Sequence, residues 1–259
     1  MPDTRRGFIQ RLTSWTLAGS IAAPAIAQGS FVRRLPGKGI KALAFDAFPI
    51  FDPRPIAGLA EELFPGKGPE LTNLWRTRQF EYQWLRALSD RYQDFWRVTG
   101  DALTFAAATM KLDLTEEKRT KLMDAHLKLK VWPDVPAALQ SLKSAGIKLV
   151  FLSNMTEKML RENMRNNGLD GLFDGVFSTD QNYSYKPSPK AYQIAIDQLG
   201  IQKSGIGFVA FAGWDAAGAK AFGYPTYWIN RQHQPKEELG VTPDWTGNDL
   251  NELVSALKG

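Results

Sequence analysis

Short apolar runs alternating with helical stretches dominate the pattern of the chain from residue 40 onward. Runs of strand length lie at Ala42–Phe45, Lys148–Leu152, Gly175–Ser178, Gly207–Phe211 and Thr226–Ile229. Helical spacing of apolar residues follows several of them, at Thr156–Asn166, Pro189–Leu199 and Trp214–Phe222. Strands that alternate with helices predict an α/β protein, with a Rossmann-like parallel sheet as its core and helices on both faces.

A long stretch without strand character separates the first apolar run from the second. Helical spacing is present at Leu71–Leu88, Asp94–Lys111 and Thr115–Lys130. The first of these stretches carries an apolar stripe that we expect to be core, formed by Leu71, Leu74, Trp75, Phe80, Trp84, Leu85 and Leu88. The pattern predicts a helical cap domain at residues 54–133, inserted after the first strand of a core domain at residues 38–53 and 134–259.

The first 27 residues are expected to be an export signal rather than part of the fold. Thr4-Arg5-Arg6-Gly7-Phe8-Ile9 is a twin-arginine pattern, and a modestly apolar stretch leads from it to the small residues of Ala25-Ile26-Ala27. That stretch is too short and too mixed with polar residues to span a bilayer well. We therefore expect a periplasmic mature protein that is not attached to the membrane after cleavage.

Composition argues against several kinds of chemistry. The chain has no cysteine, so disulfides, thiolate metal sites and cysteine nucleophiles are excluded. Its only histidines, His126 and His233, are too few for a multi-histidine metal site, and we expect both at the solvated surface. Of the net charge of +5, the expected signal contributes +2, and the remaining +3 is spread along the chain, which argues against nucleic acid as a partner and suits a small anionic substrate.

Polar residues stand at the ends of the predicted strands, where open parallel sheets bind their ligands. Asp46 follows the first strand, and Ser153 and Asn154 follow the second. Asp180 and Lys186 come after the third strand, and Asp215 after the fourth. Because the carboxyl ends of parallel strands share one edge of the sheet, we expect five of these six residues to converge on one crevice.

This order of Asp, Ser, Lys and Asp, with a helical insert after the first strand, resembles the haloacid dehalogenase superfamily. The match to its type II L-2-haloacid dehalogenases is closer. It covers about residues 40–250 and is carried by the blocks LWRTRQFEYQWLRALSDRY (74–92), LSN (152–154), YKP (185–187), FVAFAGWDAAGAKAFGYPTYWINR (208–231) and TPDW (242–245). The resemblance implies that fold, a homodimer, and hydrolysis of small 2-haloacids such as haloacetates and L-2-halopropionates to 2-hydroxy acids.

The resemblance also implies residue roles. Asp46 would displace halide from the substrate and form an aspartyl ester, with Lys186 keeping Asp46 ionised. Arg76 would hold the departing halide, and Asp215 would orient Lys186 or the hydrolytic water. The remaining pocket residues would bind substrate or shape its site: Ser153, Asn154, Phe48, Tyr192, Trp214, Phe80 and Phe95.

Phosphatases of the superfamily differ at two of these positions. They carry a second acidic residue two positions after the nucleophile and use Mg²⁺, whereas this chain has Phe48 there and a single acidic residue, Asp215, in the fourth motif. Two carboxylates alone make a poor magnesium site, so we expect neither metal nor cofactor. Two alternatives stay open: a magnesium-dependent phosphatase of small phosphomonoesters, and a weakened protein that binds small carboxylates without turnover.

The chain also departs from the dehalogenase pattern. Phe48 and Pro49 replace the usual Tyr and the Gly-Thr that follows it, so a threonine hydroxyl that touches the nucleophile is missing. Ala210 and Ala212 replace Ser and Asn near the water position, which leaves open whether ester hydrolysis is slow. The bulky pocket expected from Phe48, Phe211 and Trp214 favours the smallest substrates, the haloacetates.

Overall fold

A six-stranded parallel sheet forms the centre of residues 39–258, the part of the chain that the computed structural model describes. The predicted export signal lies outside these residues. The strand order is β5-β4-β1-β6-β7-β8. The strands are β1 (Ala42–Phe45), β4 (Lys148–Ser153), β5 (Gly175–Ser178), β6 (Ile206–Ala210), β7 (Thr226–Ile229) and β8 (Trp245–Gly247). The predicted α/β class is confirmed, and β8 is a strand that the apolar pattern missed.

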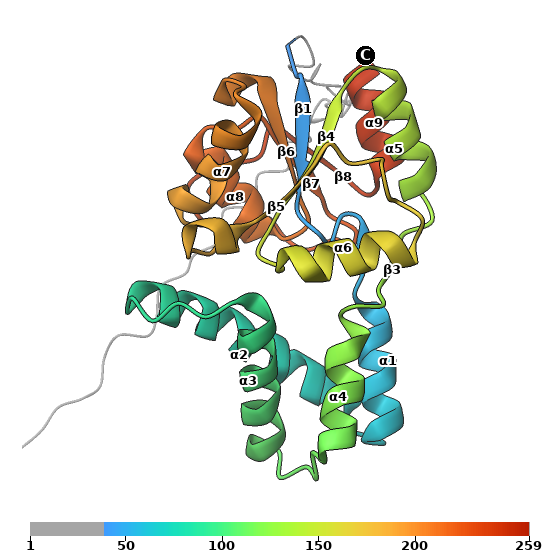
Figure 1. The fold of residues 1–259 in the computed structure, drawn as a ribbon, viewed down its shortest axis with the longest axis vertical. Helices are drawn as coiled ribbons and strands as arrows, with labels where there is room; N and C mark the ends of the chain where they lie inside the picture. The colour runs from blue at the N-terminus through green and yellow to red at the C-terminus, as the bar shows by residue number, and fades with distance from the viewer. Residues whose placement is uncertain (1–38, 259) are drawn as a thin grey trace, which may run out of the picture. The chain divides into compact units, whose positions relative to one another are not determined.

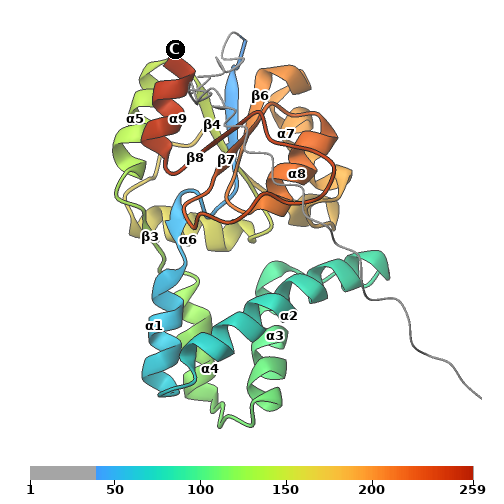
Figure 2. The same cartoon turned by 180° about the vertical axis from the view of Figure 1, so that it is seen from behind.

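Helices cover both faces of the sheet, because the side chains of each strand alternate between two cores. Leu43 and Phe45 of β1 lie in one core with residues of α5 (Val135–Ser144), α6 (Glu157–Asn166) and α9 (Leu250–Lys258). Ala44 lies in the other core with residues of α7 (Pro189–Leu199) and α8 (Gly213–Phe222). Figures 1 and 2 show α5 and α9 on one side of the sheet and α7 and α8 on the other.

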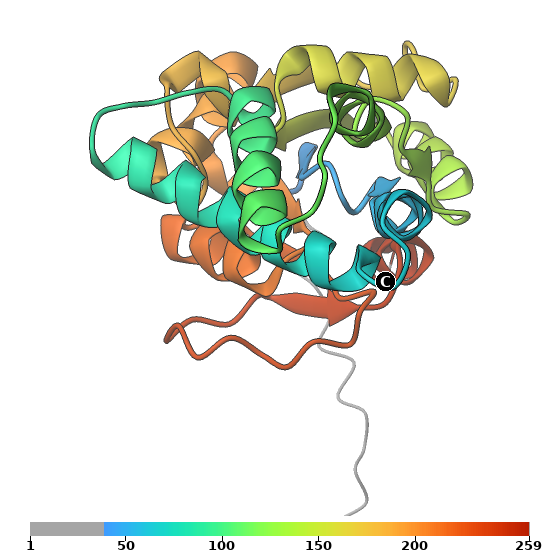
Figure 3. The same cartoon turned by 90° about the horizontal axis from the view of Figure 1, so that it is seen from below.

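Four further helices form a group at one end of the sheet (Figures 1 and 2). They are α1 (Arg54–Leu63), α2 (Gly68–Leu88), α3 (Phe95–Thr109) and α4 (Glu116–Ala125). They lie between β2 (Phe51–Asp52) and β3 (Lys130–Val131), which pair antiparallel where the chain enters and leaves the group. Figure 3 shows α2 crossing that end of the molecule. None of the helices in the described range is long and apolar enough to cross a membrane.

The apolar stripe expected along α2 is only partly core. Leu71 and Trp75 are buried, but Leu85 and Leu88 are 58% and 84% exposed, so the expectation was wrong for these two. Towards its C-terminal end α2 contacts the loop that precedes α7. There Trp84 donates a hydrogen bond to the carbonyl oxygen of Lys186. The contact with this loop, rather than the apolar spacing, decides which side of this part of the helix is buried.

A buried ion pair fixes the loop that follows β1. Arg231 donates to both carboxylate oxygens of Asp134, at 2.9 and 2.8 Å, and to the carbonyl oxygen of Pro49 at 3.0 Å. Burial alone would raise the pKa of Asp134, but Arg231 and the backbone N–H of Leu250 outweigh burial and lower it. Both side chains are less than one-tenth exposed, so removing either partner would leave the other as an unpaired charge in the protein interior, which is strongly destabilising.

Replacing Arg231 with methionine is therefore expected to lower the free energy of unfolding by about 3–5 kcal/mol at pH 7, since it leaves Asp134 charged and without its cation. The deficit should shrink in acid, where protonation of Asp134 removes the advantage of the wild type. Urea unfolding at pH 7 and in mild acid measures both effects. Arg54→Met, which breaks the exposed pair with Asp52, is the matched control and should cost no more than about 1 kcal/mol. Equal losses for the two variants would contradict the assignment.

Candidate active site

Asp46 stands directly after β1, and its carboxylate is held by three donors. Its backbone N–H continues the pairing with β6 by donating to Val209. Carboxylate oxygen Oδ1 accepts from Lys186 Nζ at 2.8 Å and from Ser153 Oγ at 3.2 Å. Oxygen Oδ2 accepts only from the backbone N–H of Phe48, at 3.2 Å, among the described residues. The two oxygens therefore differ, because Oδ1 is fixed by two side chains whereas Oδ2 is left freer.

Lys186 is 1% exposed and lies between two carboxylates. Its ammonium group contacts Asp46 at 2.8 Å and Asp215 at 2.6 Å. Burial alone would lower the pKa of Lys186, but the two carboxylates outweigh burial and raise it, so the lysine stays charged. The cation offsets the repulsion that two buried carboxylates would otherwise exert on each other.

Asp215, near the start of α8, has both carboxylate oxygens engaged. Oδ2 accepts from Lys186, and Oδ1 accepts from the hydroxyl of Tyr192 at 2.7 Å. Burial raises the pKa of Asp215, while Lys186 acts in the opposite direction. A Cβ atom at Gly218 would lie 2.6 Å from the Tyr192 hydroxyl, so glycine is needed for α7 and α8 to approach this closely. With both oxygens engaged, Asp215 is placed to orient Lys186 rather than to bind a water molecule freely.

Asn154, which follows β4, is linked to α2 through Gln83, a residue that was not identified from the sequence. Its Oδ1 accepts from the backbone N–H of Lys186 at 2.9 Å, which fixes its amide orientation. Its Nδ2 therefore donates, and the acceptor is Oε1 of Gln83 at 2.8 Å. Gln83 is fully buried, and its Nε2 has no partner among the described residues. The orientation of Asn154 thus depends on a residue of α2.

One pocket of about 250 Å³ brings most of the predicted residues together. It is lined by ten of them: Asp46, Phe48, Arg76, Phe80, Phe95, Ser153, Asn154, Lys186, Trp214 and Asp215. The eleventh, Tyr192, is fully buried behind Asp215. Asp180 does not line the pocket and instead accepts a hydrogen bond from Tyr92. Five of the six polar residues at strand ends therefore converge, as expected.

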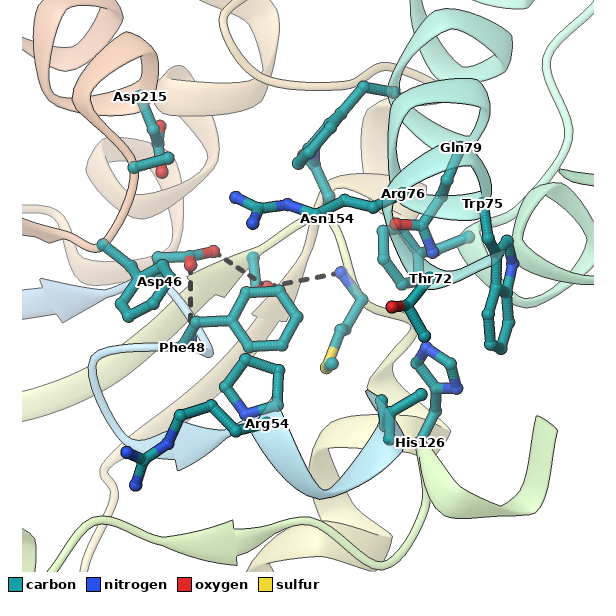
Figure 4. A pocket seen from close by; sticks show the side chains of 18 of the residues that line it. Asp46, Phe48, Arg54, Thr72, Trp75, Arg76, Gln79, His126, Asn154 and Asp215 are labelled. Carbon is teal, nitrogen blue, oxygen red and sulfur yellow. Dashed lines mark hydrogen bonds between the residues drawn. The ribbon is translucent and has the colours of Figure 1, made fainter. Parts of the chain in front are cut away.

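Arg76 reaches from α2 into the pocket, towards Asp46 and Asp215 (Figure 4). The side chain is exposed to the pocket, yet the surrounding protein displaces enough water to lower its pKa. Aromatic rings form the wall beside it, with Trp214 edge-on to Phe80 at 5.4 Å between ring centroids. Phe48 lies opposite, 5.9 Å from Phe211. A cation in an apolar, partly dry wall is suited to holding a small anion.

His126 was expected at the surface, and that expectation was wrong. It is 7% exposed, lines the pocket, and packs edge-on against Trp75. Burial lowers its pKa to about 4, so the ring is neutral at pH 7. Lysines surround His126 in the sequence, and they suggested an exposed position. His126 is instead buried together with Leu122 and Met123. Thr72 and Gln79 also line the pocket and were not identified from the sequence.

The donor set around Asp46 is poor in metal ligands. Among residues 39–258 there is no group of three or more His, Cys, Asp or Glu side chains placed to hold a metal ion. The space between the carboxylates of Asp46 and Asp215 is taken by Lys186 Nζ, and Phe48 offers no side-chain oxygen. These residues do not fit a magnesium ion, which prefers several oxygen ligands.

Comparison with known proteins agrees with this geometry. Residues 25–223 match the family model of haloacid dehalogenase-like hydrolases. The chain is 42% identical to an (S)-2-haloacid dehalogenase of Pseudomonas sp. (strain YL), over 85% of this chain and 95% of that protein. It is 40% identical to haloacetate dehalogenase H-2 of Moraxella sp. (strain B), over 85% and 99% of the two chains.

A solved structure is similar along almost its whole length. The L-2-haloacid dehalogenase of Xanthobacter autotrophicus with chloropropionic acid covalently bound aligns with a TM-score of 0.79 and 32% identity, covering 85% of this chain and 99% of that one. The chain therefore belongs to the haloacid dehalogenase-like hydrolases, and within them to the L-2-haloacid dehalogenase family.

Proposed function

We propose that this protein hydrolyses small 2-haloacids, including haloacetates and L-2-halopropionates, to 2-hydroxy acids through an ester on Asp46. The observation that carries the proposal is the Asp46 carboxylate, which is bound by Lys186 and Ser153 at one oxygen and freer at the other. Phe48 supplies no acid for a phosphate leaving group. Relatives named for the same reaction, one with chloropropionic acid covalently bound, support it.

In the first step, Oδ2 of Asp46 attacks the carbon that bears the halogen. A carbon–oxygen bond forms as the carbon–halogen bond breaks, and the halide leaves with its electron pair on the opposite side. Arg76, which reaches into the same pocket, receives the departing anion. Oδ2 is the attacking oxygen because it has a single hydrogen bond to give up, whereas Oδ1 has two.

In the second step, water attacks the ester carbonyl of Asp46. Oδ1 is now the carbonyl oxygen, and its donors Lys186 and Ser153 are placed to stabilise the negative charge that develops on it. The bond between the carboxyl carbon and Oδ2 then breaks, the 2-hydroxy acid leaves with that oxygen, and a proton is released. Asp215 and Tyr192 hold Lys186 in position through both steps.

A single turnover of excess enzyme with L-2-chloropropionate in ¹⁸O-labelled water tests the ester. The product lactate should carry unlabelled oxygen from the enzyme, and the label should enter the Asp46 carboxylate, as mass spectrometry of the peptide would show. Label that appears directly in lactate would rule out the nucleophile. Mg²⁺-dependent release of nitrophenol from its phosphate, without halide release, would instead favour a phosphatase. Thermal stabilisation by lactate without any turnover would favour a carboxylate-binding protein.

Replacement of Gln83 should affect substrate binding without a matching loss of stability. Gln83→Met removes an unpartnered, buried Nε2 that costs about 1–3 kcal/mol but leaves Asn154 Nδ2 without its acceptor at a similar cost, so the free energy of unfolding should stay nearly unchanged. Because Asn154 loses its acceptor, KM for chloroacetate should rise about tenfold with a smaller change in kcat. Urea unfolding and steady-state halide release measure the two effects. Gln198→Met, at an exposed position of α7, should change neither. An unchanged KM in Gln83→Met would contradict this role.

We also propose that the protein is exported by the twin-arginine route and acts in the periplasm. The support is the sequence Thr4-Arg5-Arg6-Gly7-Phe8-Ile9 and the small residues at 25–27. In cells that express the full chain, halide-releasing activity should appear in the periplasmic fraction. Replacing both Arg5 and Arg6 with lysine should retain it in the cytoplasm.

A homodimer completes the proposal. Leu85 and Leu88 of α2 and Phe105 of α3 are exposed large apolar side chains on two helices that pack together. Large apolar side chains that are exposed on neighbouring helices are candidates for contact between two copies of a chain. Light scattering of the purified protein should give twice the mass of one chain, and a monomer at micromolar concentration would contradict the proposal.

A further inference from the structure

The pocket continues well beyond the residues that the proposed reaction uses. From Asp46 it follows α2 to a second end lined by Thr72, Gln79 and His126 (Figure 4). Its volume is about 250 Å³. A haloacetate needs no more than about 150 Å³, even if each of its roughly five non-hydrogen atoms is given the ~30 Å³ of a water molecule. The pocket is therefore larger than a haloacetate requires, and we name the second end the distal subsite.

His126 presents a lone pair to the distal subsite. Its Nδ1 lies 3.2 Å from the carbonyl oxygen of Leu122, which can only accept, so Nδ1 carries the proton. In the neutral ring Nε2 is then an acceptor, and it has no partner among the described residues. The residue is 7% exposed, and its ring is turned towards Thr72 and the pocket (Figure 4). An acceptor without a partner that opens onto a pocket points to a ligand that donates a hydrogen bond.

Gln79 offers a second acceptor, and the network around it fixes which atom faces the pocket. The hydroxyl of Thr99 donates to the carbonyl oxygen of Phe95 at 2.6 Å, so it must accept from Gln79 Nε2, also at 2.6 Å. Oε1 of Gln79 is therefore the atom left without a partner in the described part of the chain. Gln79 is only 9% exposed and lines the pocket.

Thr72 adds a third acceptor, because its hydroxyl donates to the carbonyl oxygen of Gly68 at 2.9 Å and keeps its lone pairs free. Three acceptors do not suit an anion. An ammonium group would be repelled by Arg76, which lines the same pocket one helical turn before Gln79. A neutral primary amide fits better, since it has two N–H donors for these acceptors and a carbonyl oxygen for Arg76.

We propose that the distal subsite binds the primary carboxamide end of a longer 2-haloacid, so that substrates of this class are preferred to apolar ones of equal size. The inference rests on the proposed dehalogenation and extends it to a substrate class. The reaction is unchanged: halide leaves the carbon next to the carboxylate, Asp46 supplies the oxygen of the new hydroxyl, water restores the Asp46 carboxylate, and the amide is not altered. Thr72, Gln79 and His126 act on specificity and take no part in the chemistry.

The test compares amides with their apolar isosteres as substrates of the wild-type protein. L-2-chlorosuccinamate is paired with L-2-chloro-4-methylpentanoate, and L-2-chloroglutaramate with L-2-chloro-5-methylhexanoate, because each pair has the same number of non-hydrogen atoms. We expect kcat/KM for halide release to be about tenfold higher for the amide in at least one pair. Chloroacetate is measured alongside to establish that the protein is a dehalogenase.

His126→Leu and Gln79→Met, made separately, should each lower the ratio of amide to isostere about tenfold. Both substrates are measured with the same variant, so a loss of folded protein lowers the two rates equally and leaves their ratio unchanged. His233→Asn, at the other histidine, which is exposed and outside the pocket, is the matched control and should keep the wild-type ratio. If the wild-type protein turns over chloroacetate but its kcat/KM for the amide is no higher than for the isostere in either pair, the subsite holds only water. That result would overturn this inference and leave the proposed function standing. Absence of halide release from chloroacetate would overturn the proposed function and this inference together.

Discussion

Asp46→Asn should lower halide release from chloroacetate by at least about 10⁴-fold, the largest effect expected of any single substitution in this protein. An amide cannot displace halide, and Asp215, the only other carboxylate among the described residues that line the pocket, has both oxygens engaged by Lys186 and Tyr192. Lys186 keeps one carboxylate partner in the variant, so the protein should remain folded. A halide electrode and urea unfolding measure activity and stability.

The control for this variant is Asp197→Asn, at an exposed position of α7, which should keep wild-type activity. Because hydrolysis of the introduced asparagine would regenerate the nucleophile, the mass of the peptide that contains residue 46 must be checked in the same samples. Residual activity within about 100-fold of the wild type, in protein shown to carry asparagine, would mean that water attacks the substrate directly. The ester mechanism would then be wrong.

The residues of this candidate site that could be predicted share one property: they follow buried strands. Asp46, Ser153 and Asp215 come after apolar runs that are short enough to be recognised as strands in the sequence. Parallel strands bring their carboxyl ends to one edge, so the convergence of these side chains follows from the fold class alone. The resemblance to known dehalogenases then added Arg76, which lies on a helix and has no strand to mark it.

The residues that could not be predicted depend on contacts that α2 makes with residues distant in the sequence. Gln83 is polar in the middle of a helix, and nothing in its neighbours shows that it reaches Asn154. His126 follows the last residue of α4 in a Lys-rich stretch, yet packing against Trp75 buries it. Apolar spacing identifies the side of a helix that is buried only when one partner covers its whole length. Leu85 and Leu88 are exposed because α2 changes partners along its length.

Lys186→Met should lower kcat/KM at pH 7 by at least about 10³-fold, with part of the loss recovered as the pH rises. The substitution removes the ammonium group between the buried carboxylates of Asp46 and Asp215, and Arg76, which lines the same pocket, forms no ion pair with either of them among the described residues, so the two should share a proton at neutral pH. A protonated pair lacks the nucleophile, which returns only when the pH exceeds the raised pKa of the pair. The missing donor to Oδ1 is a separate loss of about 10²–10³-fold that no change of pH restores.

Stability should respond to pH in the opposite direction. Removing one partner of a buried ion pair costs about 3–5 kcal/mol at pH 7, but in this variant the folded state binds the shared proton more tightly than the unfolded chain does. Its free energy of unfolding should therefore fall further as the pH rises, and the deficit relative to wild type should be smaller at pH 5 than at pH 7. Activity that recovers between pH 7 and 9.5 while stability falls is a combination that a merely misfolded variant cannot produce. Lys190→Met, at an exposed position of α7, should show neither trend. A loss of activity that does not change with pH would mean that Lys186 acts as a hydrogen-bond donor and not as the cation that keeps Asp46 ionised.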